Sequence, residues 1–227
     1  MSIPSNNPNL AWSILKPSQQ KSKLKLPKPS VKLSENVIRF VAISDTHDKH
    51  LKMNIPSGDV LLHCGDFTFF GDKRKHLISI DNFLGTLPFR RKVLIAGNHD
   101  WGIFNSYKTD PYIFKNCEYL QDSGTTIYGY NIYGTPWVPW FHYGAFMLER
   151  GEELQGKWQK IPDDTDILLT HGPPLGYGDK SFSKNRAGDV DLLLEIQNRI
   201  KPLMHIFGHI HESRGCWTDG TTKFLNV

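Results

Sequence analysis

Aspartate, asparagine and histidine side chains gather in five short motifs along the chain. In sequence order the motifs are Asp45-Thr46-His47, Gly65-Asp66, Gly97-Asn98-His99-Asp100, His171-Gly172 and Gly208-His209-Ile210-His211. Carboxylate, amide and imidazole groups without a thiolate form a ligand set for divalent ions such as Mn, Fe, Zn or Co. So many ligands exceed the need of one ion and suit two ions that share a carboxylate. The motifs therefore predict metal-assisted catalysis.

A short apolar segment of the kind that forms a buried strand precedes each motif. The five segments are 37–43, 59–64, 92–96, 166–170 and 203–207. A single Asp-x-His or Gly-Asp is usually a surface loop or a turn, and a lone histidine is usually structural, but their joint occurrence favours a site. Because ligands of open α/β sheets bind outside the carboxyl ends of the strands, we expect the motifs to converge there.

Two amphipathic segments between the apolar ones predict helices. The first spans roughly 72–84 with Asp72 as its expected cap, and the second spans about 189–200 with Asp189 as its cap. Strands that alternate with helices predict an α/β fold with helices on the sheet faces.

The spacing within two motifs adds a geometric expectation. Asp45 and His47 are two residues apart, as are His209 and His211. In extended backbone, residues i and i+2 point the same way, so each pair is expected to aim at one metal pocket. The other histidines have no such neighbours and are interpreted as surface or packing residues; they are His50, His63, His76, His142 and His205.

The formal net charge of +4 arises from the first 35 residues. They contain a single acid, Glu35, and lysines at positions 16, 21, 23, 25, 28 and 32. This composition, which also includes several prolines, predicts a disordered Lys/Pro-rich tail over 1–35 and a folded domain over 36–227. The tail is interpreted as a solvated extension, with a lysine arm for an acidic partner, a membrane surface or RNA as the alternative. The nearly neutral remainder makes polymeric nucleic acid an unexpected partner.

The chain has the features of a cytoplasmic protein. Its longest apolar runs are too short to span a membrane, and its start lacks the apolar block of a secretory signal. The three cysteines, Cys64, Cys117 and Cys216, have neither zinc-site nor CxxC spacing, and their odd number argues against a disulfide framework. A reducing compartment is therefore expected.

The order of the five motifs resembles that of the calcineurin-like metallophosphoesterase superfamily. The resemblance covers residues 37 to about 215, which is nearly all of the expected domain. The segments LLHCGDFT, KVLIAGNHD and ILLTHGPPLGYGDK are similar to the branch of metallophosphoesterase domain-containing proteins first described from brain. The resemblance implies an α/β fold in which a two-sheet β-sandwich is flanked by helices.

The resemblance also implies roles for the motif residues. The implied metal ligands are Asp45, His47 and His211 at one ion, Asn98, His171 and His209 at the other, and Asp66 between the two. Manganese is the expected metal, with Fe, Zn, Co or Mg as alternatives. His99 would not bind metal and would protonate the leaving oxygen as a general acid, and Asp100 would orient a neighbouring imidazole.

The implied activity is hydrolysis of phosphodiesters, with cyclic or small nucleotides as substrates. Two cations neutralise the phosphate oxygens and make hydroxide available at neutral pH. Protein serine/threonine phosphatases continue the second motif through an Asp-Arg pair, whereas this chain continues through Phe67-Thr68-Phe69-Phe70, so small diesters are expected instead. A weakly active metal- and nucleotide-binding scaffold or regulatory protein is the alternative, and a nuclease comes third.

Three further segments carry expectations. The aromatic residues Trp137, Trp140, Phe141, Tyr143 and Phe146 either pack over the sheet or stack a nucleotide base. A cationic rim is an alternative to a solvated loop for Lys180, Lys184 and Arg186. The final residues 223–227 read as a strand that only begins, and because family members usually continue, a truncated C-terminus with an unfinished sheet edge is expected.

Overall fold

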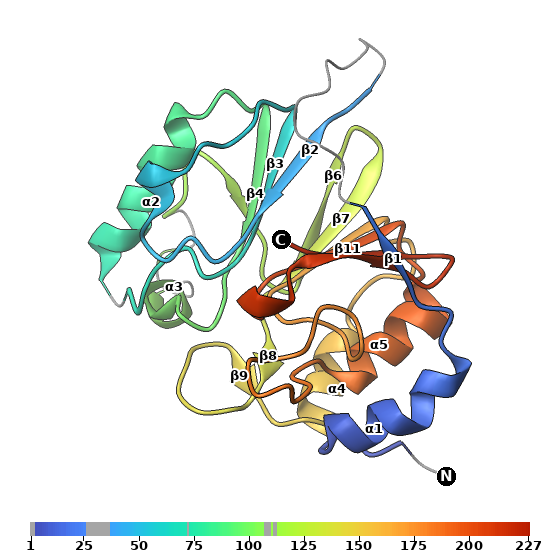
Figure 1. Ribbon diagram of the computed structural model, residues 1–227. Helices are drawn as coiled ribbons and strands as arrows, with labels where there is room; N and C mark the ends of the chain where they lie inside the picture. Colours follow the sequence, from blue (N-terminus) through green and yellow to red (C-terminus); the bar gives the residue numbers. More distant parts are fainter. Residues whose placement is uncertain (1–2, 26–36, 72, 107–109, 111–112) are drawn as a thin grey trace.

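Two β-sheets lie face to face and carry helices on their outer sides (Figure 1). A computed structural model of the chain describes residues 3–25, 37–71, 73–106, 110 and 113–227. Figure 1 shows α2 and α3 on the outer side of one sheet and α1, α4 and α5 on the outer side of the other. The expected two-sheet α/β sandwich flanked by helices is therefore confirmed.

The first sheet is parallel and follows the order of the chain, β2-β3-β4-β5. Its strands are β2 (Phe40–Ile43), β3 (Val60–Cys64), β4 (Arg91–Ile95) and β5 (Glu118–Tyr119). Helices α2 (Arg74–Thr86) and α3 (Trp101–Ser106) pack on it through buried side chains such as Leu77, Ile80 and Ile103. The short helix η2 (His50–Lys52) follows the loop after β2.

The second sheet is mixed and has the order β1-β12-β13-β11-β10-β7-β6. Its strands are β1 (Ser22–Leu24), β6 (Ser123–Ile127), β7 (Tyr130–Thr135), β10 (Ile167–Thr170), β11 (Met204–Phe207), β12 (Gly215–Thr218) and β13 (Lys223–Asn226). Strands β7, β10, β11 and β13 run parallel, whereas β6, β12 and β1 pair antiparallel with their neighbours.

Helices cover the outer face of this second sheet. They are α1 (Pro8–Leu15) with η1 (Lys16–Ser18), α4 (Glu152–Trp158), and α5 (Val190–Glu195), which continues as the π-helix η3 (Ile196–Ile200). Two remaining strands, β8 (Val138–Pro139) and β9 (Met147–Leu148), form a small parallel pair, and η4 (His211–Ser213) follows β11. Among the described residues, no helix combines the length and apolar character that a membrane crossing requires.

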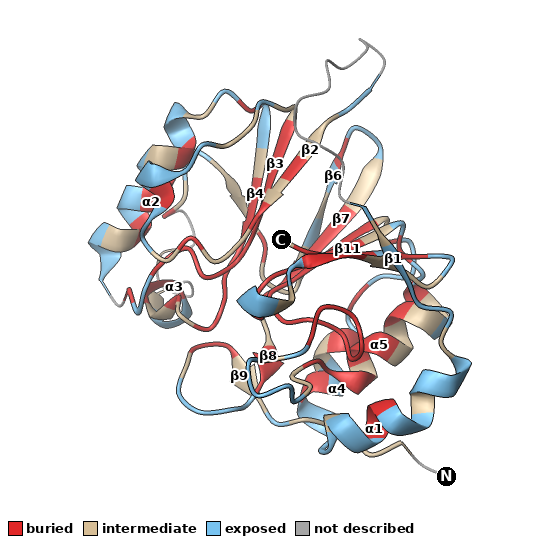
Figure 2. Ribbon diagram, in the orientation of Figure 1, coloured by how far each residue is buried: buried red, intermediate tan, exposed pale blue. Residues whose placement is uncertain are grey.

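Alternate residues of the central strands meet between the two sheets. Val60, Leu62 and Ile95 of the first sheet share one apolar cluster with Leu169 and Ile206 of the second. Strand β3 is buried along its whole length, and Figure 2 shows it in the interior of the fold. Because both sheets are parallel at their centres and covered on both faces, their strands read as continuous apolar runs.

The strands and helices expected from the sequence are present with small shifts at their ends. The five apolar segments form β2, β3, β4, β10 and β11. The first helix is described from Arg74, and its expected cap, Asp72, lies outside the described residues. The cap of the second helix is confirmed, because the Asp189 carboxylate accepts a hydrogen bond from the Leu192 N–H at 2.9 Å.

The prediction of a disordered tail is wrong for residues 3–25. Trp12 of α1 is 8% exposed and packs in the apolar cluster of α4 and α5, and β1 pairs antiparallel with β12. Burial of a few apolar side chains and the addition of a strand to a sheet edge hold this segment, which composition alone does not reveal. Residues 26–36 lie outside the described part.

The expectation of an unfinished C-terminal edge is also wrong. Strand β13 lies inside the sheet, between β11 and β12, and the Val227 N–H donates to the Phe207 carbonyl at 3.0 Å. The edge beyond β12 is covered by β1 from the start of the chain. The sequence could not show this pairing, because β1 and β12 are far apart along the chain.

Candidate metal centre

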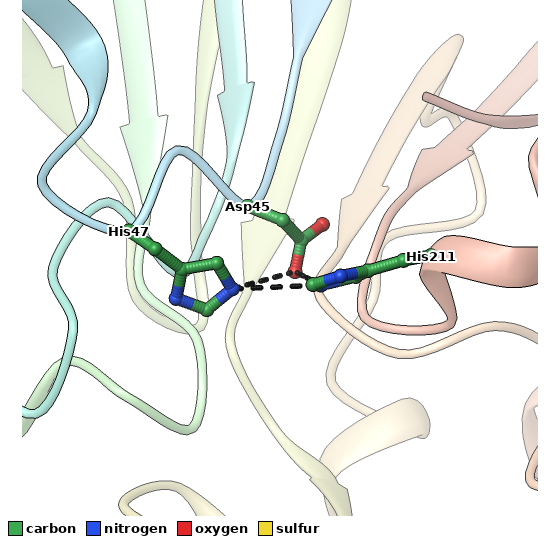
Figure 3. Close-up of side chains that lie close together, drawn as sticks. All are labelled: Asp45, His47 and His211. Atoms are coloured by element: carbon green, nitrogen blue, oxygen red, sulfur yellow. Dashed lines mark hydrogen bonds and ion pairs between the residues drawn. The ribbon is translucent and has the colours of Figure 1, made fainter.

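The five polar motifs lie in the loops that follow β2, β3, β4, β10 and β11, where the two sheets meet. The first group contains Asp45, His47 and His211 (Figure 3). The His211 Nε2 lies 3.1 Å from the Asp45 Oδ1 and 3.4 Å from the His47 Nε2. Asp45 and His47 come from the first sheet and His211 from the second, so the group exists only when the sheets pack together.

A second group contains Asp66, His171 and His209. The His171 Nε2 lies 3.2 Å from the Asp66 Oδ2 and 3.0 Å from the Asn98 Oδ1, which adds the amide to the group. The opposite ring nitrogen of His171, Nδ1, is 2.8 Å from the Cys64 carbonyl. A hydrogen bond there leaves Nε2 free to act as a metal ligand.

Asp66 connects the two groups. Its Oδ2 lies 3.9 Å from the Nε2 atoms of both His47 and His99, and its Oδ1 accepts from the His99 N–H at 2.8 Å. The atoms of His47, Asp66 and His99 form a third group of metal-ligating size. Three overlapping groups, two of which share the buried Asp66 carboxylate, are the geometry that two neighbouring ions sharing a ligand would need.

The donor atoms suit divalent cations. Within each group they lie within 4.8 Å of one another, and bonds of about 2.0–2.2 Å from nitrogen and oxygen to one ion fit between atoms so spaced. Carboxylate, amide and imidazole donors without sulfur favour Mn, Fe, Zn or Co. The residues therefore fit the ions that the sequence predicted.

Burial and pairing set the charges in the centre. Burial alone would raise the pKa of Asp66, but the neighbouring His171 imidazole holds it below the usual value. Likewise, burial alone would raise the pKa of Asp45, and the hydrogen bond from His211 holds it low. Burial lowers the pKa of His209 to about 4, which keeps its imidazole neutral. Ionised carboxylates and the neutral imidazole of His209 are the protonation states that metal ligands require. Burial alone would lower the pKa of His171, but the Asp66 carboxylate raises it to about 9, so a metal ion bound there would have to displace the proton of this imidazolium.

Left-handed backbone conformations occur at four of the candidate ligands. Asp45, His47, Asp66 and His209 have φ angles of 55°, 43°, 52° and 67°. Such conformations are uncommon outside glycine and cost of order 1 kcal/mol or more each, and they cluster at functional sites. The expectation that Asp45–His47 and His209–His211 aim as extended pairs is therefore wrong in its mechanism. Asp45 and His47 reach the same group through a turn. His211 belongs to that group as well, whereas His209 belongs to the group of Asp66 and His171.

Gly97 allows the loop after β4 to lie directly against Asp66 and His171. A side chain there would place its Cβ 2.3 Å from the Asp66 Oδ1 and 2.6 Å from the His171 Cε1. Only a residue without Cβ permits the loop after β4 to approach both groups this closely.

Asp100 acts on the backbone rather than on an imidazole, which corrects the expectation. Its carboxylate accepts from the Thr68 N–H at 2.9 Å, the Thr68 hydroxyl at 2.7 Å and the Gly97 N–H at 2.8 Å. Burial and, next, the Asp66 carboxylate raise the pKa of Asp100 to about 8. The residue joins the loops after β3 and β4 into one unit.

The remaining histidines are packing or surface residues, as expected. His63 and His205 are 1% and 0% exposed and contact Thr46 and Thr170 through their Nε2 atoms. His50 is also buried, whereas His142 is exposed. Cys64, Cys117 and Cys216 are free thiols, in agreement with the expected absence of a disulfide framework.

The aromatic segment divides between packing and exposure. Trp137 packs against Phe146, whereas Trp140, Phe141 and Tyr143 are exposed. The Phe141 ring lies 5.3 Å from that of His209, at the border of the centre. Among the three basic residues for which a cationic rim was the alternative to a solvated loop, Arg186 is paired with Asp179 and lies over Trp12. Its charge is therefore used within the fold.

Phe69 and Phe70 lie against the centre, although the sequence interpretation used them only to note a missing arginine. Their rings are 5.6 Å and 4.3 Å from the His99 ring. Two consecutive apolar rings within a loop that directly follows a metal motif were the signal that could have identified them.

Comparison with known proteins agrees with the geometry. A family model described as calcineurin-like phosphoesterase matches residues 38–213. The chain is 43% identical over 213 residues to metallophosphoesterase domain-containing protein 1 of Homo sapiens, with 83% of this chain and 65% of that protein covered. It is 39% identical over 214 residues to a UPF0046 protein of Caenorhabditis elegans, covering 85% of this chain and 75% of the other. The chain thus spans just under two thirds of the human relative's length.

Solved structures show the same fold at low sequence identity. The crystal structure of TT1561 of Thermus thermophilus superposes with a TM-score of 0.56 at 14% identity, with 84% of this chain and 89% of that chain covered. The match to the family model extends over all five motifs, from the loop after β2 to η4. The chain therefore belongs to the calcineurin-like phosphoesterase family.

Proposed function

We propose that the chain hydrolyses small phosphodiesters, with cyclic or small nucleotides as substrates, using two divalent cations and His99 as proton donor. The observation that carries this proposal is the set of three overlapping ligand groups, two of which share Asp66 and one of which includes His99. Membership of a phosphoesterase family supports the hydrolase class.

Two groups of residues would hold the ions. The ligands are Asp45, His47 and His211 at one position, Asn98, His171 and His209 at the other, and Asp66 at both. Cations held there would neutralise phosphate oxygens and make hydroxide available at neutral pH, with manganese as the ion that we expect. The chain contributes the placement, because ligands from both sheets meet only in the packed fold.

His99 has the position of a proton donor. Its backbone N–H is fixed by the Asp66 carboxylate, and its side chain stays 20% exposed beside the ligand groups. Burial lowers the pKa of His99, so its imidazolium is a stronger acid and is populated mainly at acidic pH. In the reaction, a P–O bond forms to the water oxygen as the P–O bond to the leaving oxygen breaks, and the leaving oxygen takes the His99 proton. The proton that the water loses passes to solvent, from which His99 is reprotonated.

The nature of the leaving group tests this role. An alkoxide needs a proton, whereas p-nitrophenolate leaves without one. We expect His99→Asn to lower the rate on nucleoside 2′,3′-cyclic phosphates by about 10²–10⁴-fold and to change bis-p-nitrophenyl phosphate hydrolysis much less. Both rates are measured with the Mn²⁺-loaded full chain.

His142→Asn is the matched control, because it removes an exposed histidine from another part of the chain. Equal losses of His99→Asn on both substrates would assign His99 to metal or phosphate binding instead of proton transfer. If the native protein binds nucleotide without any turnover, it is a metal-dependent nucleotide-binding scaffold and the hydrolase proposal is wrong.

A further inference from the structure

Two exposed phenylalanine rings lie beside the residue proposed to protonate the leaving group. Phe69 and Phe70 are 60% and 45% exposed, although both belong to a loop of the metal centre. The Phe69 ring stacks on His99 at an interplanar angle of 22°, and it lies 5.8 Å from the His47 ring. The two phenylalanine rings are 5.1 Å apart. They form one apolar surface, named here the Phe69–Phe70 wall.

The loop that carries the wall is held firmly. The Phe69 N–H donates to the Asp48 carboxylate at 2.8 Å, and the Gly102 N–H donates to the Gly71 carbonyl at 2.6 Å. On the other side, the Thr68 hydroxyl donates to the Asp100 carboxylate. A loop fixed at both ends presents its rings in one orientation, and such preorganisation lowers the cost of binding a ligand.

The backbone of Phe70 is strained, which a purely structural role does not explain. Its φ is 53°, in the left-handed region that favours glycine or asparagine and disfavours bulky side chains. The ring gains little from burial at 45% exposure. Strain at an exposed aromatic residue beside a reaction centre therefore indicates a functional requirement for the ring.

We propose that the Phe69–Phe70 wall is the subsite for a flat heteroaromatic ring carried by the leaving group, which is a nucleobase. This inference rests on the proposed function, because it uses the proton transfer from His99. In a nucleoside cyclic phosphate, the leaving oxygen and the base are attached to the same ribose. When the leaving oxygen reaches His99, the base lies one sugar away, against the rings that flank His99. Aromatic side chains bind bases through their faces, with little preference among bases.

A pair of substrates that differ only in the base tests the wall. These are adenosine 2′,3′-cyclic phosphate and the methyl riboside 2′,3′-cyclic phosphate, assayed with the Mn²⁺-loaded full chain. We expect the native protein to prefer the adenosine compound by about 10- to 100-fold in kcat/KM. Phe69→Ala and Phe70→Ala should remove most of this preference, because kcat/KM should fall much further on the adenosine compound, through KM, than on the base-free compound.

Matched variants separate stacking from other effects. Phe70→Leu keeps an apolar side chain without a flat face and should also lose most of the preference. Tyr128→Ala removes a ring of similar exposure, 46%, at the β6–β7 turn on the opposite end of the strands. This variant should retain the preference for the adenosine compound. If the phenylalanine variants slow both compounds equally, the rings only position His99 and the proposal is wrong. A loss of preference in Phe141→Ala alone would likewise overturn it.

A binding measurement keeps the wall testable if the proposed function fails. Calorimetric titration of the Mn²⁺-loaded protein compares adenosine 3′-monophosphate with inorganic phosphate and needs no turnover. A tighter affinity for the nucleotide that falls in Phe69→Ala and Phe70→Ala supports the wall even in an inactive protein. Equal affinities for the two ligands overturn it, whether or not diesters are hydrolysed.

Discussion

The two sheets contribute to the metal centre in the same way but are assembled differently. Loops after β2, β3 and β4 of the first sheet carry Asp45, His47, Asp66, Asn98 and His99, and loops after β10 and β11 of the second carry His171, His209 and His211. The first sheet forms from strands in chain order, β2-β3-β4-β5, whereas the second joins β1 from the start of the chain to β12 and β13 from its end.

This difference shows where the centre depends on distant parts of the chain. The ligands of the first sheet come from one stretch of about 55 residues and could be positioned by local βα units. Those of the second need the placement of β11, which lies between β10 and β13. The candidate metal centre therefore joins a half built from consecutive βα units to a half in which β11 is held between strands from separate parts of the sequence.

Removing the charge of Asp66, which lies between the two halves, should have the largest effect on hydrolysis. Asp66 is in two of the three ligand groups and pairs with residues of both sheets. We expect Asp66→Asn to lower Mn²⁺-dependent hydrolysis by more than about 100-fold, beyond the loss from a residue that only supports a ligand. The measurement is kcat/KM on bis-p-nitrophenyl phosphate together with calorimetric Mn²⁺ binding.

His211→Ala provides the comparison, because this residue is in one group only and its side chain is 54% exposed. Its loss of activity should be smaller than that of Asp66→Asn. If the two variants lose activity equally, Asp66 does not connect the two halves as described.

The N-terminal helix α1 should stabilise the second sheet and its helices. Trp12 is buried against that sheet's helices and would lie 1.9 Å from a Cβ placed on Gly176. We expect Trp12→Ala to lower the free energy of unfolding by about 3 kcal/mol, through lost apolar burial and a remaining cavity. Urea unfolding measures this change.

Leu10→Ala is the control for this prediction. Leu10 lies on the same helix, α1, and is 49% exposed, so its replacement should change the unfolding free energy by less than about 0.5 kcal/mol. If Trp12→Ala changed the unfolding free energy as little as Leu10→Ala is expected to, the packing of α1 would not stabilise the folded unit.

The sequence predicted the first half better than the second, for a physical reason. Residues 59–64 and 92–96 are nearly continuous apolar runs because β3 and β4 are covered on both faces, and such runs are visible without any knowledge of pairing. The β1–β12 pair is different. Ser22–Leu24 is a short edge strand with exposed side chains, and its stability comes from a partner almost 200 residues away.

The same distinction applies to the metal centre. The types and order of the candidate ligands were visible in the sequence, and so was their place at strand ends. How His209 and His211 divide between two groups was not, because it depends on a φ of 67° at His209 and on the start of η4 at His211. The Phe69–Phe70 wall was missed because its exposure and its distance from His99 are tertiary properties.

Each half contains a buried histidine whose lowered pKa can be compared with that of the other. His63 of β3 and His205 of β11 are both buried, both contact a threonine and both have a pKa lowered by burial to about 3. His63 also interacts with the Asp45 and Asp66 charges of the metal centre, whereas burial alone lowers the pKa of His205. His205 is therefore the cleaner test of how a buried neutral imidazole affects stability.

Replacing His205 by glutamine should reduce the loss of stability in acid. Between pH 6.5 and about 3, the unfolded chain binds a proton at His205 that the folded chain does not, so stability falls as the pH is lowered through this window. One such proton contributes up to about 1.4 kcal/mol per pH unit. We expect His205→Gln to have a correspondingly shallower slope in urea unfolding between pH 6.5 and 4, and the exposed-site variant His142→Gln to keep the native slope. An unchanged slope in His205→Gln would mean that His205 takes up its proton without unfolding, for which the sheet beneath α5 would have to open to water.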